Sequence, residues 1–461
     1  MNLDAIKYVY LIGAGGIGMS ALGRYFLKRG VPVWGYDKTR VAFTQQLESE
    51  GMNIIYEDRS EQIPEALLDA ENRSSVLVIY TPAVPRHTAI VQTFTTAGLR
   101  IFKRAEVLGL LSQGHQTFAV AGTHGKTTTS TLLAHILKVA GKEPIAFLGG
   151  ISTNYQTNYL AGNADSMLVA EADEYDRSFL HLHPHSSIIT STDADHLDIY
   201  GDSEAMQESF AQFARQSGNN GFLIVKKGLG FPKDIADRSI SYHTSEPADV
   251  MPLNLKLEGD RYHFSLKVKD ATIENLELGL PGMHNLENAL AAGALCYLNG
   301  ISGDSIREAL RSFSGVKRRF EYIVRNPEFI FIDDYAHHPE ELRACISSAR
   351  TIYAGKKITG VFQPHLYSRT RDFMHEFARS LELLDEVILL DIYPARELPI
   401  EGISSAALLD LIHTTSKSIC SKAELPERIA ALHPEVLLTL GAGDIDALVQ
   451  PLKSRLEAEQ V

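Results

Sequence analysis

The feature that most constrains how this chain can fold is the segment AVAGTHGKTTTS at residues 119–130. An apolar run suited to a buried strand leads into the turn from Gly122 to Thr128, and helical character continues to about Val139. Small residues in such a turn allow backbone N–H groups to surround an anion at a helix N-terminus, where the helix dipole favours negative charge. The pattern therefore predicts an α/β domain with a phosphate-binding loop at the end of one strand.

Two side chains of this loop indicate the kind of ligand it binds. Lys126 can reach the outer phosphates of a nucleoside triphosphate, and the hydroxyl of Thr127 can ligate Mg²⁺. The spacing G-x-x-G-K-T-T is tighter than that of the common phosphate loop, but the strand–loop–helix context favours ATP over a plain tight turn with an exposed lysine. The predicted ATP contacts in this loop are Gly122, Thr123, His124, Gly125, Lys126, Thr127 and Thr128.

A second glycine-rich turn lies in LIGAGGIGMS, residues 11–20, and begins at Gly13 after the apolar run Tyr8–Ile12. Its G-x-G-x-x-G spacing, with Asp37 closing the next apolar run, is typical of a dinucleotide-binding βαβ unit and by itself favours NAD or FAD. Beside an ATP loop the preference changes to a UDP-sugar, whose diphosphate suits the helix N-terminus and whose ribose suits Asp37. The predicted UDP contacts are Gly13, Ala14, Gly15, Gly16, Ile17, Gly18 and Asp37.

Length and periodicity predict three α/β domains. A chain of 461 residues is too long for one core, and apolar strand-like runs alternate with helical stretches three times. Residues 221–281 differ, because apolar and polar residues alternate there around an EGDR turn, as in an antiparallel hairpin. The expected domains are N-terminal Rossmann-like (1–111), central P-loop ATPase-like with the hairpin region (112–314) and C-terminal Rossmann-like (315–461), with linkers at 112–116 and 312–323.

Composition excludes several classes of protein. Lys and Arg number 44 against 57 Asp and Glu, giving a net charge of −13, which disfavours binding of nucleic acid or an anionic membrane through the overall field. The three cysteines are far apart, which indicates a reducing compartment and no zinc or disulfide framework. No run has the length of a membrane span, and the N-terminus lacks the features of a signal peptide. We expect a cytoplasmic enzyme with small-molecule substrates, and the sequence does not determine its oligomeric state.

Two acidic clusters follow strand-like runs of the central domain. EADEYD, at residues 171–176, and TDADHLD, at 192–198, are each expected at the carboxyl end of a strand. A carboxylate beside a phosphate loop commonly holds Mg²⁺, whereas a solvated acidic turn is the plain alternative. A carboxylate of EADEYD and His196 of TDADHLD, at the same sheet edge as Thr127, therefore suggest a site with more than one metal ion.

Three further clusters are ambiguous when taken singly. GMHNLENALAA (282–292) could begin a helix with Asn285 as its cap, GVKRRFE (315–321) could be a solvated linker, and IDDYAHHPEEL (332–342) could be a polar turn before a helix. Their occurrence in one chain with two phosphate loops is harder to attribute to chance. They point to a nucleotide-dependent enzyme assembled from several domains.

Taken together, these segments resemble the Mur ligases, the ATP-dependent amino-acid ligases of peptidoglycan synthesis. The resemblance covers the whole chain in the order GAGGIGMS, GTHGKTTT, EADEYD, DADHLD, HNLENA, GVKRRFE, DDYAHHP and FQPHLYSRT. Within the family, VFQPHLYSRTRDF at residues 361–373 resembles the members that join L-alanine to UDP-N-acetylmuramate. GTHGKTTT and DDYAHHP also occur in murein peptide recycling ligases, which stay the alternative.

The resemblance implies a UDP-binding first domain, an ATPase second domain and a third domain that closes over both. It places His284, Asn285 and Asn288 near the adenine, and His365, Tyr367 and Arg369 in the alanine pocket. It also implies two Mg²⁺ ions, with Thr127 and Glu171 as ligands and His196 serving the second ion. The implied catalytic residues are Lys126 together with Arg319 and Asp334, which would contact ATP from the third domain, and His337.

The chemistry that this resemblance implies is coherent in itself. A carboxylate is a poor electrophile, so ATP must convert it to an acyl phosphate, with Lys126 and Mg²⁺ stabilising the transferring phosphoryl group. The alanine amine then attacks, and His337 is the candidate that helps to deprotonate the ammonium. One departure is Leu366, where many alanine-adding members have arginine. Another is the lack of any lysine between Lys142 and Lys226, where other Mur ligases often use a carbamylated lysine.

Two other kinds of protein would share part of this pattern. A nucleotide-sensing module without catalysis would not require the paired carboxylates, His196 or the histidines of the third domain. A folate-type polyglutamate ligase would share the second and third domains but would lack the GAGGIG domain of residues 1–110. The sequence therefore favours the alanine-adding ligase over both.

Overall fold

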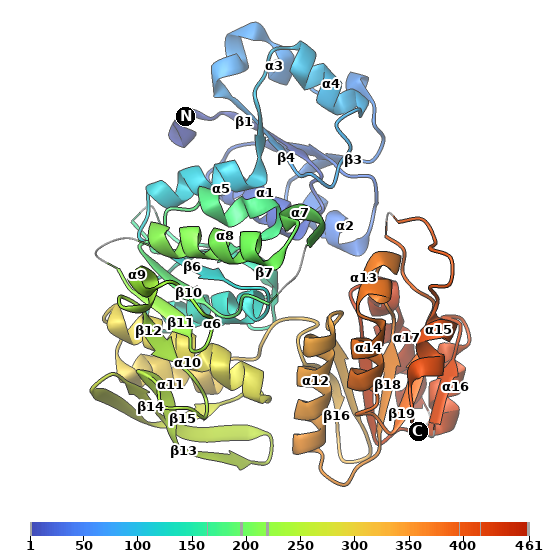
Figure 1. Cartoon of the computed structure of the whole chain (residues 1–461). Helices are drawn as coiled ribbons and strands as arrows, with labels where there is room; N and C mark the ends of the chain where they lie inside the picture. The colour runs from blue at the N-terminus through green and yellow to red at the C-terminus, as the bar shows by residue number, and fades with distance from the viewer. Residues whose placement is uncertain are drawn as a thin grey trace. The chain divides into compact units, whose positions relative to one another are not determined.

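The computed structural model describes residues 2–163, 165–193, 197–217, 221–395, 397–414 and 416–458. Within these ranges the chain forms three β-sheets covered by helices (Figure 1). It divides into two compact units, the first comprising Met1–Asn254, Phe264–Leu276 and Glu287–Phe313, and the second Leu255–His263, Glu277–Leu286 and Ser314–Val461. Across the described part of the chain, no helix has both the length and the apolar character needed to cross a membrane.

The first sheet has parallel strands in the order β3-β2-β1-β4-β5. Since β1 lies between β2 and β4, the chain changes direction there, and open α/β sheets bind ligands at such a switch point. The glycine-rich turn follows β1 at this place. The elements are β1 (Tyr8–Ile12), α1 (Ile17–Lys28), β2 (Val33–Tyr36), α2 (Ala42–Ser49), β3 (Asn53–Ile55), α3 (Glu65–Leu68), β4 (Val76–Tyr80), α4 (Ala89–Thr96), β5 (Ile101–Lys103) and α5 (Arg104–Gln113).

The second sheet runs in the order β15-β14-β13-β12-β11-β10-β6-β9-β7-β8. Its strand β6 lies between β10 and β9, and both pairs are parallel, so the segments that follow these three strands meet at one edge. Its strands are β6 (Thr117–Ala121), β7 (Ile145–Ser152), β8 (Thr157–Ala161), β9 (Leu168–Ala172), β10 (Ser186–Ile189), β11 (Leu223–Lys226), β12 (Ile240–Tyr242), β13 (Val250–Glu258), β14 (Arg261–Val268) and β15 (Ala271–Leu278). The helices that follow in sequence are α6 (Lys126–Val139), the 3-10 segment η4 (Tyr175–His181), α7 (Leu197–Tyr200), α8 (Ser203–Gln216), α9 (Lys233–Ala236), α10 (Met283–Leu298) and α11 (Gly303–Ser312).

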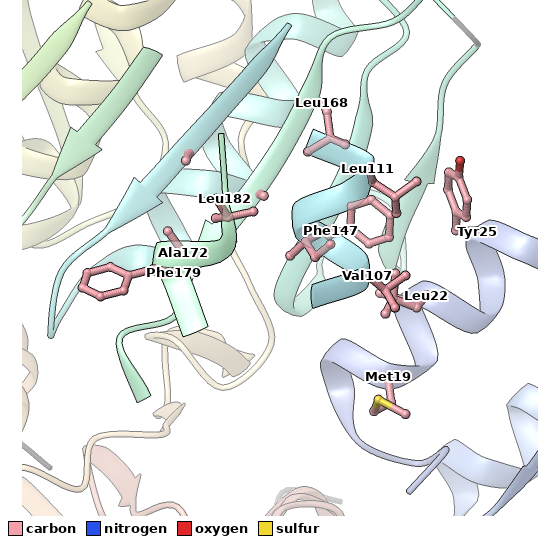
Figure 2. Packing of buried hydrophobic residues seen from close by; sticks show 14 of the residues in the cluster. Met19, Leu22, Tyr25, Val107, Leu111, Phe147, Leu168, Ala172, Phe179 and Leu182 are labelled. Carbon is pink, nitrogen blue, oxygen red and sulfur yellow. The ribbon is translucent and has the colours of Figure 1, made fainter. Parts of the chain in front are cut away.

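Helix α1 contributes to a core that it shares with both of these sheets. Leu22 and Tyr25 of α1 belong to the same buried cluster as Val107 of α5 and Phe147 of β7 (Figure 2). The rings of Tyr25 and Phe147 have centroids 5.8 Å apart. The helix that follows the first glycine-rich turn is therefore held against the second sheet as well as its own.

The third sheet has the order β16-β17-β21-β18-β19-β20, in which β16 pairs antiparallel to β17 and the other pairs are parallel. Separate buried clusters pack on its two faces, one with Leu342 of α12 and Phe377 of α14, the other with Ile429 of α16 and Leu452 of α17. The elements are β16 (Glu321–Arg325), β17 (Ile330–Asp334), α12 (Pro339–Ile352), β18 (Ile358–Phe362), α13 (Tyr367–Asp372), α14 (Met374–Leu381), β19 (Glu386–Leu389), α15 (Ser405–Leu411), β20 (Ser416–Ile419), α16 (Leu425–Leu432), β21 (Val436–Leu440) and α17 (Val449–Ala458).

The predicted fold class is confirmed, with parallel α/β sheets and a hairpin region whose strands β13 and β14 flank the predicted EGDR turn. One alternative for Asn285 is excluded, and one local expectation was wrong. Asn285 is not a helix cap, because α10 begins at Met283, and the expected linker at 312–323 ends inside β16, which begins at Glu321. The linker was mispredicted because β16 forms by pairing with β17, and the composition of residues 312–323 alone does not reveal this pairing. The domain bounds at 111 and 314 stay a prediction.

Candidate active site

The predicted ATP loop is braced by the chain that follows β10. Thr190 Oγ1 donates to the carbonyl of His124, and the backbone N–H of His124 donates to Ser191 Oγ at 2.8 Å. Gly125, in the left-handed region at φ +80°, precedes the first residue of α6, and a Cβ there would lie 2.7 Å from Asn288 Oδ1. Thr190 and Ser191 were missed from sequence, although they follow a buried strand in the run TSTDADH.

Lys126 begins α6 and forms a buried ion pair that sequence reasoning did not foresee. Its Nζ donates to Glu174 at 2.7 and 2.9 Å and to the carbonyl of Gly122 at 2.7 Å. Burial disfavours the ammonium, but the carboxylates of Glu174 and its neighbours outweigh this effect and raise the pKa of Lys126. The lysine therefore keeps its positive charge at the mouth of the loop.

The first two predicted metal ligands lie on neighbouring elements. Thr127 is in the first turn of α6, after β6, and Glu171 is on β9, whose register pairs it with Val120 of β6. A Cβ on Gly149 of β7 would lie 2.1 Å from Glu171 Oε2, so this glycine leaves room for the carboxylate. His196 lies outside the described residues.

The donors of this site are hard oxygen atoms. A hydroxyl and a carboxylate fit Mg²⁺, which keeps several waters and binds through one or two protein groups plus substrate phosphates. Among the described residues, no three or more His, Cys, Asp or Glu side chains form a metal-binding group. An ion at this place would therefore depend on the nucleotide for part of its coordination.

The predicted UDP loop is ordered by Asp37. Its Oδ2 accepts the backbone N–H of Gly15 at 2.8 Å, and its Oδ1 accepts that of Thr39 at 3.1 Å. Helix α1 begins after Gly16, which supplies no side-chain cap, and its first turn holds no acidic residue. Since the first N–H groups of a helix lack partners within the helix, this end suits an anionic ligand.

Helix α10 carries the three residues predicted near the adenine. Asn288 Oδ1 accepts from Thr129 Oγ1 at 3.0 Å, which places it beside the ATP loop in the first compact unit. Asn285 donates its amide to the carbonyl of Pro281 at 2.6 Å. His284 has Nδ1 3.5 Å from Ser348 Oγ, and burial lowers its pKa to about 4, which leaves the ring neutral at pH 7.

In the second compact unit, Asp334 orders the turns around Arg319. Its carboxylate oxygens accept the N–H groups of Phe320 and Ala336, both at 2.7 Å. Burial raises the pKa of Asp334 to about 6, while Arg319 and the two N–H donors oppose the shift. The Arg319 guanidinium lies 5.1 Å from the ring centroid of Tyr335 and 3.8 Å from a Glu341 oxygen. Asp334 therefore positions the loop that carries Arg319.

His337 is held so that one ring nitrogen is available for proton transfer. Its Nδ1 lies 3.0 Å from the carbonyl of Tyr335 and 3.2 Å from Glu341 Oε2. Because a carbonyl can only accept, Nδ1 carries the hydrogen in the neutral ring, and the lone pair is on Nε2. The ring centroid of His365 lies 6.0 Å away, so the structure brings these two predicted residues together.

The segment predicted to bind the amino acid is fixed by the loop after β19. His365 stacks on Tyr393 with centroids 5.7 Å apart, and burial, with His337 and Arg369 nearby, lowers the pKa of His365 to about 4. Leu366, at φ +70°, donates its N–H to the carbonyl of Tyr393 at 2.9 Å. These contacts lead directly into α13, which begins with the predicted residue Tyr367.

Glu397 holds the other side of this segment. Its carboxylate accepts the N–H of Ser368 at 2.9 Å and the hydroxyl of the same residue, one position before Arg369 in α13. Ser368, Tyr393 and Glu397 were all missed from sequence. The signal available was the polar run DIYPARE directly after a buried strand.

Three family models match the chain in succession. Residues 8–116 match the model described as Mur ligase family, catalytic domain, residues 120–296 match the Mur ligase middle domain, and residues 318–444 match the Mur ligase, glutamate ligase domain. Together they cover most of the sequence.

Individual proteins are similar over nearly the full length. The UDP-N-acetylmuramate–L-alanine ligase of Cytophaga hutchinsonii is 48% identical, covering 98% of this chain and 97% of its own, and that of Porphyromonas gingivalis is 47% identical, covering 98% and 99%. Among solved structures, the UDP-N-acetylmuramate–alanine ligase of Thermotoga maritima has a TM-score of 0.82 at 27% identity, covering 98% of this chain and 99% of its own. A murein peptide ligase of Psychrobacter arcticus has a TM-score of 0.69 at 22% identity, covering 98% of each chain, a likeness of fold alone.

Proposed function

This chain belongs to the Mur ligase family, and from that premise we propose that it joins L-alanine to the carboxylate of UDP-N-acetylmuramate in an ATP-dependent step of peptidoglycan synthesis. The observation that carries the proposal is the identity of nearly half, over almost the whole length, with curated ligases of this specificity. Murein peptide ligases have the same fold, but their similarity to this chain is lower. They remain the second candidate for the experiment below.

The reaction has two chemical steps. The sugar carboxylate attacks the γ-phosphorus of ATP, ADP leaves, and an acyl phosphate forms. The amine nitrogen of L-alanine then attacks the carbonyl carbon, and inorganic phosphate leaves from the tetrahedral intermediate. Activation is needed because a carboxylate at neutral pH is a poor electrophile.

The first step depends on the loop before α6. We infer that Lys126 moves its ammonium from Glu174 toward the outer phosphates, where it stabilises negative charge on the transferring group. Thr127 and Glu171 would hold Mg²⁺, which offsets charge on the same phosphates when it is bound. A second ion with His196 as ligand is part of the proposal, as is the binding of UDP by the turn after β1.

The second step depends on the second compact unit. Arg369 would pair with the carboxylate of L-alanine, in a segment fixed by Glu397 and Tyr393. His337 would take the ammonium proton through Nε2, because Nδ1 is engaged by the carbonyl of Tyr335. His365, with its lowered pKa, stays neutral and leaves the positive charge to Arg369. Arg319 and Asp334 would complete the ATP site.

We further infer that the enzyme acts in the cytoplasm, where both ATP and nucleotide sugars are available. Its partners in this proposal are the small molecules UDP-N-acetylmuramate and L-alanine. The acidic composition, with a net charge of −13, gives no reason to expect a nucleic-acid partner.

The test is a phosphate-release assay with ATP, UDP-N-acetylmuramate and a panel of amino acids, with ligation products identified by mass spectrometry. Phosphate release that needs all three substrates, with L-alanine preferred, supports the proposal. In a parallel assay, the tripeptide L-alanyl-γ-D-glutamyl-meso-diaminopimelate replaces the amino acid, with UDP-N-acetylmuramate as the acceptor. A further reaction contains free N-acetylmuramate in place of UDP-N-acetylmuramate. Preferential ligation of the tripeptide to UDP-N-acetylmuramate would instead assign the peptide-adding activity.

A further inference from the structure

Arg104, the first residue of α5, lies directly against the first turn of α1. A Cβ built on Gly18, the second residue of α1, would be only 2.6 Å from Arg104 Nη1 and 3.1 Å from Cζ. Any residue with a side chain at Gly18 would displace the guanidinium. The glycine at this position of the G-x-G-x-x-G turn therefore makes room for a cation as well as for a ligand.

The end of α1 and the guanidinium are two positive groups that repel each other, and the carboxylates of Asp37 and Asp173 offset part of this repulsion. The N-terminus of a helix carries a partial positive charge, so a guanidinium beside it is repelled. Helix α1 has no acidic residue in its first turn and no side-chain cap to offset the repulsion. Within the described part of the chain, Arg104 pairs with Asp173 at 3.4 Å, which is long for a charge-assisted contact. A negatively charged ligand at this end of α1 would interact favourably with both positive groups.

The first turn of α1 is fixed before any ligand arrives. Asn158 of β8, fully buried, donates its amide to the carbonyl of Ile17 and to Ser20 Oγ, the latter at 3.0 Å. It also accepts from Arg24, whose guanidinium pairs with Glu50 at 2.6 Å. A turn held in this way can present its N–H groups to a ligand at little cost in ordering.

We propose that Arg104 binds the diphosphate of the nucleotide sugar, together with the backbone N–H groups of the first turn of α1. The proposal rests on the proposed function, because that function supplies the diphosphate. Arg104 suits this role, since a guanidinium can make two parallel hydrogen bonds to phosphate oxygens. On binding, it exchanges its long contact with Asp173 for contacts to the ligand.

The chain supplies a matched control in the residue before it. Lys103 pairs with Asp176 at 2.6 Å, so it holds the same acidic segment that Arg104 contacts through Asp173. In the described part of the chain, the Lys103 side chain contacts Asp176, whereas Arg104 also lies against Gly18 of α1. If Arg104 only held the acidic segment, replacing Lys103 would therefore cause the same loss of ligand binding as replacing Arg104.

The experiment compares Arg104→Gln, Arg104→Ala, Arg104→Lys and Lys103→Ala with wild type. For each, KM values for UDP-N-acetylmuramate, ATP and L-alanine are measured, together with inhibition constants for UDP, UMP and uridine. For Arg104→Gln and Arg104→Ala we expect the KM for the nucleotide sugar and the inhibition constant of UDP to rise by about ten- to a hundredfold. Inhibition by uridine and the KM values for ATP and L-alanine should stay near wild type, Arg104→Lys should recover part of the loss, and Lys103→Ala should show none of it.

Three results would overturn the assignment. An unchanged inhibition constant for UDP in Arg104→Gln would exclude a contact between Arg104 and the diphosphate. This holds also if the KM for the nucleotide sugar rises, because Arg104 would then contact the carboxylate of the sugar. Equal losses for uridine and UDP would indicate a distorted site, as would the same losses in Lys103→Ala. Failure of the proposed function itself is distinguishable, because it would appear in wild type as a lack of phosphate release that depends on the nucleotide sugar.

Discussion

Replacing Lys126 by alanine should damage both turnover and stability, and the contacts of Glu174 allow the two effects to be separated. The Lys126 ammonium lies 2.7 and 2.9 Å from the Glu174 oxygens, and these side chains are 13% and 2% exposed. Removing one partner of such a buried pair typically lowers the free energy of unfolding by about 3–5 kcal/mol, because a buried charge is left without its counter-charge. The variant should therefore be both slow and unstable at pH 7.

The pH dependence follows from the glutamate. In the variant, burial without the ammonium favours the neutral carboxyl, so the pKa of Glu174 in the folded state is raised. Such a group contributes fully to stability below its unfolded pKa, and the contribution is lost as pH rises toward the folded pKa. With an unfolded pKa of about 4.3 and about 1.4 kcal/mol per pH unit, the part of the loss that depends on ionisation of Glu174 is about 1 kcal/mol at pH 5 and at most about 3.7 kcal/mol at pH 7.

The double variant Lys126→Ala/Glu174→Gln separates stability from catalysis. The neutral amide removes the titrating group, so urea unfolding at pH 5 and pH 7 should show stability regained at pH 7 and little pH dependence. Single-turnover phosphate release should stay about 10²- to 10³-fold below wild type in both variants, because neither supplies a cation to the transferring phosphoryl group. A double variant no more stable than Lys126→Ala at pH 7 would refute the ion-pair reasoning. Single-turnover rates near wild type would refute the catalytic role.

Four further variants test the metal site, the amino-acid site and the pH dependence of stability. Glu171→Gln should raise the Mg²⁺ concentration needed for half-maximal ATP use, and an unchanged Mg²⁺ titration would contradict the predicted ligand; His196→Ala should chiefly slow acyl-phosphate formation in rapid-quench measurements. Arg369→Ala should raise the KM for L-alanine by about tenfold or more. The matched control is Arg371→Ala, because the Arg371 side chain is exposed. An equal rise in the KM for ATP would assign Arg369 to another substrate. Because burial raises the pKa of Asp334 to about 6, its contribution to stability should be lost as pH rises from about 4 to about 6. Thermal unfolding across this range should be flatter for Asp334→Asn, and parallel curves for variant and wild type would contradict the argument.

The local pattern of the sequence determined the elements that carry the phosphate loops. The apolar run Tyr8–Ile12 predicted the bounds of β1, and AVAGTHGKTTTS predicted a strand that ends before Gly122 and a helix that continues to about Val139, where β6 and α6 do end. These predictions succeed because hydrophobic periodicity and glycine placement act over a few neighbouring residues. The order of the motifs likewise identified the family, since each motif is a contiguous stretch of chain.

Tertiary structure decided what those motifs touch. The pairing of Lys126 with Glu174 spans 48 residues and the contact of Asp37 with Gly15 spans 22, so neither follows from local spacing. The placing of Arg104 against Gly18 likewise requires α1 and α5 to pack together. Such contacts depend on which strands become neighbours, and strand order results from packing of the whole core. The sequence by itself therefore determined where the loops and their ligand-binding groups lie along the chain, and only the folded sheets decided which partners hold each group in position.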